Sequence, residues 1–411
     1  MQAADDNAQV KNNAQVNVAV VTVEPPFPVR SGGDIRNARH ILAASRLGAV
    51  SAISLHGGPR EGPHGLCSSS LGTRALRDLW RPLQGSRPLV ATLTEDERAA
   101  FAAMLTRQRP QVVVLEGIAL AGLGDLARGS GAAVVLDMHN IESDLDAQVQ
   151  RARRPLRTAL FGRRPLARRR LAIETVEREL SEAVDAVWVC SRLDADRLLG
   201  IARPRRIDVV PNVPPEFAPT VPLSRPAAAD GPRLVYAGHL GYAPNVRAAQ
   251  LLAQRILPRI RERLPAASLV LAGREPRRRI HRLAALPGVC VRANPELIAP
   301  YLAAADFSVI PLREGGGTRI KIPEAMAAGL VVVASSIAAE GLDLEPGRHA
   351  VIADSADEMA DAVVRLTADP QAYLAMAEAG RSWAQTAFDP KLAEERIALL
   401  LREVAGARVA A

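Results

Sequence analysis

The chain has 411 residues, a formal net charge of +8 and a hydrophobic content of 48%. This length predicts two domains, and the composition can supply each with an aliphatic core. Aromatic residues make up only 3% of the chain, which argues against a stacking platform for single-stranded nucleic acid.

The N-terminal residues 1–15 are polar, and we expect them to form a disordered tail. They lack the charged start and apolar core of a signal peptide. No run of the chain approaches the ~20 apolar residues that a membrane span needs. The three cysteines, Cys67, Cys190 and Cys290, match no metal or disulfide spacing, so a reducing compartment fits best. We therefore expect a cytoplasmic protein.

Residues 16–213 predict a first domain in which strands and helices alternate. A helix is expected over about residues 34–47, and residues 57–72, rich in Gly, Pro and Ser, predict a loop. Residues 156–183 predict a long helical stretch with a kink or break at Pro165. The expected strands are residues 17–23, 50–55, 112–115, 133–137, 186–190 and 207–210. Continuous apolar strands between helices indicate a parallel sheet that is covered on both faces.

A linker over residues 214–232 and a second alternating domain over residues 233–385 are expected to follow. The expected strands of this domain are residues 234–237, 268–272, 289–291, 307–310, 331–334 and 350–352. The C-terminal part, residues 370–404, predicts helix. The fold class is therefore α/β, with two doubly wound domains. Ligands of such sheets bind at the carboxyl ends of the strands, which predicts a site in a cleft between the domains.

Residues 151–170 carry much of the positive charge, because nine of these twenty residues are arginine. This density fits peripheral contact with an anionic membrane surface, worth ~1 kcal/mol per basic residue near that surface. It also fits a solvated helix face. Nucleic acid is the weakest of the three alternatives, and we expect no nucleic-acid partner.

The segment from Pro311 to Gly329 reads as a glycine loop and a short helix between two apolar strands. Thr318 is the expected N-cap and Gly329 the expected C′ glycine. Arg319 and Lys321 would lie in the first turn, where cations oppose the helix dipole but suit a bound polyanion.

Lysine usage singles out the same loop. Only three of the 52 basic residues are lysine, namely Lys11, Lys321 and Lys391. A compact ammonium suits a point contact with phosphate. The alternative is that a lysine occurs there by chance, at the solvated start of a helix.

We expect no metal site. Residues 144–146 and 194–196 have the Asp-x-Asp form, but both are expected on polar helix surfaces. The chain also lacks a G-x-G-x-x-G motif after its first strand and a Walker lysine loop.

Six short motifs occur in an order that resembles the GT-B fold, retaining nucleotide-sugar glycosyltransferases of glycosyltransferase family 4. The motifs are residues 25–33, 137–143, 210–213, 236–246, 271–274 and 315–329. The resemblance covers nearly the whole chain. It implies two Rossmann-like domains facing a central cleft, with a C-terminal helix over residues 386–411 packing back on the first domain. It also implies a nucleotide-sugar donor and no need for a bound cation.

The chain departs from the commonest pattern of this family. Many members carry two glutamates eight positions apart, and Glu324 matches the second of them. Gly316 stands at the first position, with Glu314 the nearest carboxylate. The usual Gly-Arg pair becomes Gly238-His239, so the basic residues are expected at Arg319 and Lys321, as in a subgroup with a Gly-Gly-Gly-Thr-Arg-Leu-Lys type loop.

Three residues are expected to be catalytic. Arg319 and Lys321 would stabilise the leaving diphosphate, and the resemblance places His139 near the donor sugar. Glu324 is expected to accept the ribose hydroxyls. The remaining donor-binding residues are expected to be Gly32, Gly33, Gly238, His239, Arg274, Arg292, Glu314, Gly315, Gly316, Gly317 and Thr318.

The acceptor is left open as a glycan, a lipid-linked glycan or a small molecule. Residues 57–72 and 143–164 are the expected acceptor loops. Two other functions are considered, a sugar-nucleotide epimerase of the same fold and a non-catalytic binding protein. Transfer needs an acceptor and epimerisation does not, whereas a binding protein releases no nucleotide.

Overall fold

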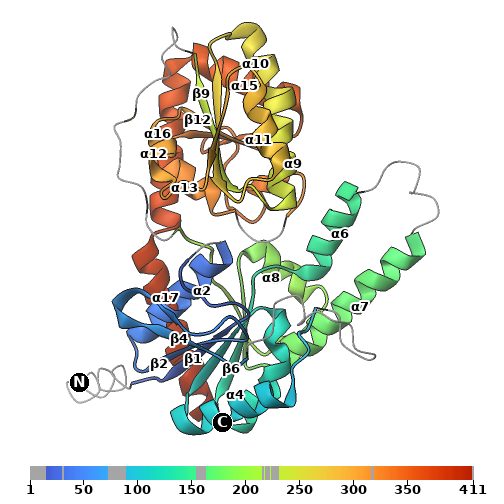
Figure 1. Ribbon diagram of the computed structural model, residues 1–411, viewed down its shortest axis with the longest axis vertical. Helices are drawn as coiled ribbons and strands as arrows, with labels where there is room; N and C mark the ends of the chain where they lie inside the picture. The colour runs from blue at the N-terminus through green and yellow to red at the C-terminus, as the bar shows by residue number, and fades with distance from the viewer. Residues whose placement is uncertain are drawn as a thin grey trace, which may run out of the picture. The chain divides into compact units, whose positions relative to one another are not determined.

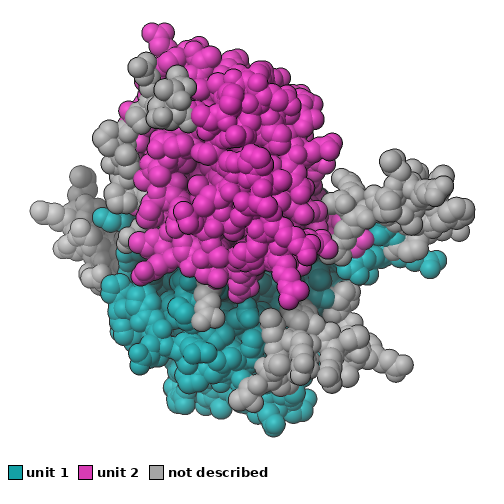
Figure 2. Space-filling view, turned by 45° about the horizontal axis from the view of Figure 1, so that its top comes forward, with its two compact units in different colours: residues 1–144, 156–211, 391–411 teal, residues 145–155, 212–390 magenta. Residues whose placement is uncertain are grey.

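The computed structural model describes residues 15–29, 32–72, 89–153, 163–214, 217, 223, 231–315 and 319–409. The chain separates into two compact units (Figure 2). The first unit contains residues 1–144, 156–211 and 391–411, and the second contains residues 145–155 and 212–390. The expected N-terminal tail and most of the expected linker lie outside the described residues.

The described strands of the first unit form one sheet in the order β3-β4-β2-β1-β5-β6-β7-β8 (Figure 1). The strands are β1 (Val18–Thr22), β2 (Val50–Ser54), β3 (Arg60–Glu61), β4 (Cys67–Ser70), β5 (Val112–Glu116), β6 (Ala133–Met138), β7 (Ala186–Val189) and β8 (Ile207–Val209). Only the edge pair β3–β4 is antiparallel among them. The predicted parallel sheet is therefore confirmed.

Side chains of β1 alternate between two hydrophobic cores, one on each face of the sheet. Val18 and Val20 belong to one core, and Ala19 and Val21 belong to the other. A strand that is buried on both faces must be apolar throughout, which explains its continuous hydrophobic run.

The helices of the first unit cover both faces of this sheet. They are α2 (Gly32–Ser45), α4 (Glu95–Gln108), α5 (Gly124–Gly129), α6 (Glu142–Arg153, continuing into the second unit), α7 (Arg163–Glu182), α8 (Arg192–Leu199) and α17 (Pro390–Val409), with short 3-10 turns η1 (Pro63–Gly65) and η2 (Ile118–Leu123). In α17, Ile397, Leu400 and Leu401 are buried in the same core as Val18. The C-terminal helix thus packs on the N-terminal domain, as expected.

Two expectations about loops are wrong. Residues 57–72 contain β3, η1 and β4, and β4 pairs with β2 at the sheet edge. Its sequence, Cys67–Ser70, has no apolar run because this strand, next to the short edge strand β3, is only partly buried. Residues 143–153 are helical in α6, and α7 begins at Arg163. Pro165 therefore lies in the first described turn of α7, where proline is tolerated, and the expected kink or break in the helical stretch stays a prediction.

The described strands of the second unit form a parallel sheet in the order β11-β10-β9-β12-β13-β14. The strands are β9 (Arg233–His239), β10 (Ser268–Arg274), β11 (Val289–Ala293), β12 (Phe307–Ile310), β13 (Val331–Ala334) and β14 (Val351–Ile352). The helices are α9 (Ala243–Leu251), η4 (Leu252–Ile256), α10 (Leu257–Arg263), α11 (Arg278–His281), η5 (Arg282–Ala285), α12 (Ala299–Ala303), α13 (Lys321–Ala327), α14 (Ser336–Ala339), α15 (Ala356–Ala368) and α16 (Pro370–Ala387).

Because these strands run parallel, their carboxyl ends meet at one edge of the sheet, and the loop before α13 follows one of them. Within the described residues, no helix of either unit is long and apolar enough to cross a membrane.

Candidate functional site

Lys321, the first residue of α13, lies in a cage of neutral groups at the carboxyl end of β9. Its Nζ donates hydrogen bonds to Tyr236 Oη and Asn245 Oδ1, each at 3.0 Å. It also lies 4.3 Å from the centroid of the Tyr236 ring, and Tyr236 Oη donates to Asn245 Oδ1 at 2.8 Å. No described carboxylate forms an ion pair with this ammonium. The cage orients the ammonium but provides no ion-pair partner for it.

The surroundings of Lys321 disfavour its charged form. Burial and, to a smaller extent, the nearby charge of Arg319 lower the pKa of Lys321 to about 7, against the opposing effect of Glu324. A bound polyanion would reverse this balance by supplying the missing negative charge.

Two glycines make room for the two cations. Gly238 has a φ of 153°, and a Cβ atom at this position would lie 3.0 Å from Lys321 Nζ. Gly315 has a φ of 144°, and a Cβ there would lie 2.8 Å from Arg319 Nη2. Side chains at either position would be strained and would crowd the cations.

The start of α13 differs from the expectation. The helix begins at Lys321 with Ile320 at its N-cap. The expected N-cap, Thr318, lies outside the described residues, as do Gly316 and Gly317. Gly329 follows the C-cap residue with a φ of 89°, which confirms the predicted C′ glycine. Because α13 has only seven residues, the positive charge here comes mainly from side chains.

Glu324 lies one turn along α13. Burial raises the pKa of its carboxyl to about 6, against the opposing charge of Lys321. No described residue hydrogen-bonds this carboxylate, so it is suited to accept ligand hydroxyls. Its expected role in ribose binding stays a prediction.

The other expected residues of this unit lie at the same sheet edge but differ in their partners. His239 ends β9, and its Nε2 lies 3.1 Å from Glu275 Oε2. Arg274 ends β10, whereas Arg292 is exposed on the outermost strand β11. The Glu314 carboxylate is buried and ion-paired with the exposed guanidinium of Arg247.

Glu314 would thus have to leave a partner to meet a ligand. Tyr236, Asn245 and Arg247 were assigned no role from the sequence, although all three lie within or beside the motif at residues 236–246. Only the fold shows that Tyr236 and Asn245 meet Lys321.

The first unit has a cavity of about 240 Å³ at the carboxyl ends of β5 and β6. Its lining residues are Val23, Leu89, Glu116, Gly117, Ile118, Ala119, Met138, His139, Asn140 and Glu142. His139 follows β6, and its side chain is 27% exposed. A cavity of this size, with polar side chains in its wall, suits a small hydroxylated group.

Two buried carboxylates hold the His139 ring from one side. His139 Nε2 lies 3.1 Å from Asp137 Oδ2 and 3.3 Å from Glu116 Oε2. Burial by itself would lower the pKa of His139, but hydrogen bonds to Asp137 and Glu116 outweigh it and raise the pKa to about 9. The imidazole is therefore protonated at neutral pH.

Arg36 of α2 forms a bidentate ion pair with Asp137. Arg36 Nε donates to Oδ2 at 2.6 Å and Nη2 donates to Oδ1 at 2.5 Å. Arg36 Nη1 also donates to the carbonyl of Val210 at 2.7 Å. Although burial favours the neutral acid, the charge of Arg36 holds the pKa of Asp137 well below its usual range.

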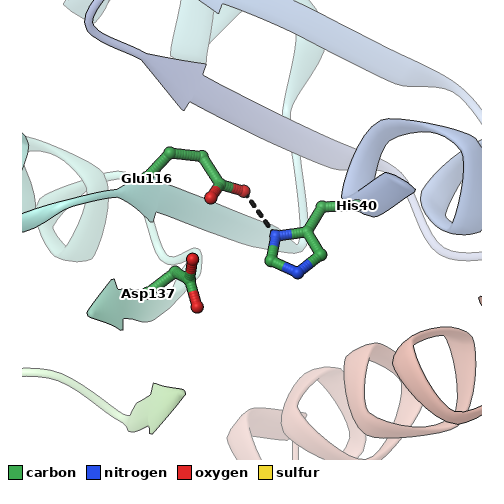
Figure 3. A group of neighbouring side chains, drawn as sticks. All are labelled: His40, Glu116 and Asp137. Carbon is green, nitrogen blue, oxygen red and sulfur yellow. Dashed lines mark hydrogen bonds and ion pairs between the residues drawn. The ribbon is translucent and has the colours of Figure 1, made fainter. Parts of the chain in front are cut away.

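His40, Glu116 and Asp137 form a compact group (Figure 3), with possible ligand atoms all within 4.8 Å of one another. His40 Nδ1 donates to Glu116 Oε1 at 2.6 Å. A metal ion does not fit this group, because the Arg36 guanidinium already covers both Asp137 oxygens. The group instead forms a hydrogen-bonded support for the His139 ring.

Gly32 and Gly33 are the first two residues of α2. With its amide nitrogen turned toward them, Asn37 donates to Gly33 O and Glu116 Oε2, each at 3.1 Å. These contacts connect the start of α2 to the side chains that support the His139 ring. The sequence analysis gave Arg36, His40 and Glu116 no role. A polar residue closing an apolar strand, as Glu116 closes β5, was the available signal.

Comparisons with known families give two matches that together cover most of the chain. Residues 35–213 match the family model described as a glycosyl transferase 4-like domain. Residues 231–369 match the model described as glycosyl transferases group 1. No curated protein matches the chain.

Solved structures share the fold over nearly the full length. Sucrose-phosphate synthase from Thermosynechococcus elongatus has a TM-score of 0.72 at 17% identity, over 96% of this chain and 100% of its own. HepE from Anabaena, solved with UDP-glucose, has a TM-score of 0.62 at 15% identity, over 94% and 99%. A glycosyltransferase from Rickettsia africae has a TM-score of 0.60 at 13% identity, over 95% and 98%.

Proposed function

We propose that the two units of the chain divide one reaction, the transfer of a sugar from a nucleotide sugar with retention of configuration. This is the reaction of the group 1, family 4-like glycosyltransferases of GT-B fold, to which the chain belongs. The second unit binds the donor, a UDP-sugar, and the first unit binds a hydroxylated glycan acceptor. The observation that carries this proposal is that Lys321, at a ligand-binding sheet edge, is held by neutral groups and has no ion-pair partner among the described residues.

Donor binding rests on the cations beside the glycine loop. Lys321 and Arg319 together offer two positive charges, and the cage around Lys321 contains no described counter-ion. A diphosphate has the complementary charge, and HepE was solved with UDP-glucose bound. Glu324 then accepts the ribose hydroxyls, and Arg274 lies near the base.

The same cations stabilise the transition state. As the bond between the anomeric carbon and the diphosphate oxygen breaks, negative charge grows on that oxygen. Lys321 and Arg319 are positioned in advance to stabilise this charge. Since side chains supply the positive charge, the transfer proceeds without a bound metal ion.

Acceptor binding rests on the cavity beside His139. Its wall combines apolar residues with the imidazolium of His139, the amide of Asn140 and the carboxylate of Glu142. Such a mixture suits the faces and hydroxyls of a sugar ring. The imidazolium hydrogen-bonds an oxygen of the sugar substrate.

Retention of configuration fits attack from the same face as the leaving group. The acceptor oxygen bonds to the anomeric carbon, the carbon–oxygen bond to the diphosphate breaks, and the acceptor proton passes to the leaving phosphate. The buried carboxylates of Glu116 and Asp137 are engaged by His40 and Arg36, so they are unsuited to act as nucleophiles.

Helix α7 supports a further part of the proposal, peripheral contact with an anionic membrane that carries a lipid-linked acceptor. Arg168, Arg169 and Arg170 are exposed, and Leu171 beside them is 62% exposed. Arg170 also pairs with Glu174 at 2.7 Å, which reduces the available charge. Residues 154–162 of the arginine-rich stretch lie outside the described residues. Salt-sensitive binding to anionic but not neutral vesicles would support this contact.

The test is product analysis with UDP-sugars in the presence and absence of hydroxylated acceptors. With an α-configured donor, we expect UDP release and an α-linked product. Both should appear only when an acceptor is present. Epimerisation of the donor without acceptor, or binding without nucleotide release, would contradict the proposal. Coupling constants of the anomeric proton distinguish retention from inversion.

A further inference from the structure

The charged side chains around His139 are buried, and together with His139 they carry equal numbers of positive and negative charges. Glu116 and Asp137 contribute two negative charges, and Arg36 and protonated His139 contribute two positive charges. Side chains of Glu116, Asp137 and Arg36 are at most 3% exposed. Loss of the His139 proton would leave an uncompensated negative charge in a buried place, which is unfavourable.

His40 contributes a further hydrogen bond to this set. Its Nδ1 donates to Glu116 Oε1, while its Nε2 is buried and has no hydrogen-bond partner among the described residues. The ring packs edge-on against Trp188, with 5.2 Å between centroids. This packing fixes the Glu116 carboxylate that faces His139.

We propose that Glu116 and Asp137 are positioning residues that hold the His139 ring by its Nε2, keep it in the protonated form, and leave Nδ1–H to donate to a substrate oxygen in the cavity. No described residue hydrogen-bonds Nδ1. This inference rests on the proposed function for the identity of the substrate but not for the geometry of the ring.

The two carboxylates that contact His139 act in the same direction. Asp137 from β6 and Glu116 from β5 favour its proton. Arg36, which would oppose it, is bound to Asp137. Glu142, in the same cavity wall, adds a further carboxylate, and Cys190 Sγ donates to the His139 carbonyl at 3.3 Å.

The direct test is a histidine NMR titration of the full chain with labelled imidazole carbons. A spectrum of His139→Gln identifies the His139 signal among the seven histidines. We expect the wild-type His139 midpoint at about 9. A wild-type midpoint at or below about 6.5, the unperturbed value for histidine, would by itself overturn the inference.

Glu116→Gln tests the carboxylate itself. Removal of one adjacent charge should lower the His139 midpoint by about 1–3 units. Glu97→Gln is the matched control, because Glu97 is an equally buried glutamate of the first unit that caps α4. An unchanged midpoint in Glu116→Gln, or an equal shift in Glu97→Gln, would contradict the proposal.

The pH profile of turnover separates this inference from the proposed function. In Glu116→Gln, kcat should fall by up to about tenfold per pH unit above the lowered midpoint and recover at lower pH. In the wild type it should hold up to about pH 9 as far as His139 is concerned. If the NMR midpoints behave as expected but His139→Gln keeps full turnover, the proposed use of His139 in transfer fails and its positioning stands.

Discussion

Each unit presents a partly buried cation at the carboxyl edge of its sheet, and the protein treats the two in opposite ways. His139 in the first unit contacts two carboxylates through Nε2, and its pKa is raised to about 9. Lys321 in the second unit lies among neutral oxygens beside another cation, and its pKa is lowered to about 7. The first cation contacts its counter-charges within the protein, whereas the second forms no ion pair with a described carboxylate and is only opposed by the nearby charge of Glu324.

This difference separates a preformed hydrogen-bond donor from a site that needs an anionic ligand. The charges around His139 are complete without substrate, so His139 can remain a donor throughout the reaction. The cage of Lys321 is completed when a diphosphate binds. His139 needs only to be positioned by the protein, whereas Lys321 depends on the binding energy of the anionic ligand.

Removal of a counter-charge in the first unit should have the largest effect. Asp137→Ala leaves the buried Arg36 guanidinium unpaired and should reduce the free energy of unfolding of this unit by about 3–5 kcal/mol. Urea denaturation measures the loss. Lys321→Met, which removes a cation that has no counter-ion in the cage, is the comparison and should cost little or nothing. A larger loss in Lys321→Met would break the contrast.

Removal of Lys321 should affect catalysis rather than folding. Lys321→Ala should raise the activation free energy by about 2–4 kcal/mol, the range for loss of one preorganised donor. Steady-state kinetics with a saturating donor measure the change. Lys391→Ala is the matched control, because Lys391 is exposed at the start of α17. Retention of more than about half of the turnover in Lys321→Ala would contradict this role.

Glu324 should contribute to binding more than to chemistry. Glu324→Gln should weaken UDP binding by about tenfold, or ~1.4 kcal/mol, because a ribose contact is equal in the ground and transition states. Calorimetry gives the affinity, and kcat should change little. A large fall in kcat with unchanged affinity would assign this carboxylate to the reacting centre.

Chelation should have no effect on turnover. Lys321 and Arg319 replace a metal ion beside the diphosphate, so an assay with EDTA should give the same rate. Activity lost to EDTA and restored by Mg²⁺ or Mn²⁺ would show that the side chains are insufficient.

The sequence predicts most of the fold because strands buried on both faces are continuous and apolar. It failed at β4, whose Cys67–Ser70 sequence pairs at a partly buried edge without an apolar run. It also failed at residues 143–153, where a polar helix carries no loop or core signal. Local pattern alone did not decide these partly exposed segments.

The loop around Lys321 was also identifiable from the sequence, since a rare lysine followed three glycines. The partners of both cations were not. Tyr236 and Asn245 meet Lys321 across 85 and 76 positions, and Arg36 meets Asp137 across 101. Contacts of this kind depend on which strand ends the topology brings together, and a single sequence does not contain that information.

Proton uptake on UDP binding tests the central claim most directly. At pH 8 Lys321, with a pKa of about 7, is mostly neutral in the free protein. A bound diphosphate raises that pKa, so binding should take up a proton and should tighten as the pH falls from 9 to 7. Calorimetry in buffers of different ionisation enthalpy measures this uptake, and Lys321→Arg should abolish it because arginine stays charged. No uptake in the wild type, or equal uptake in Lys321→Arg, would contradict the account.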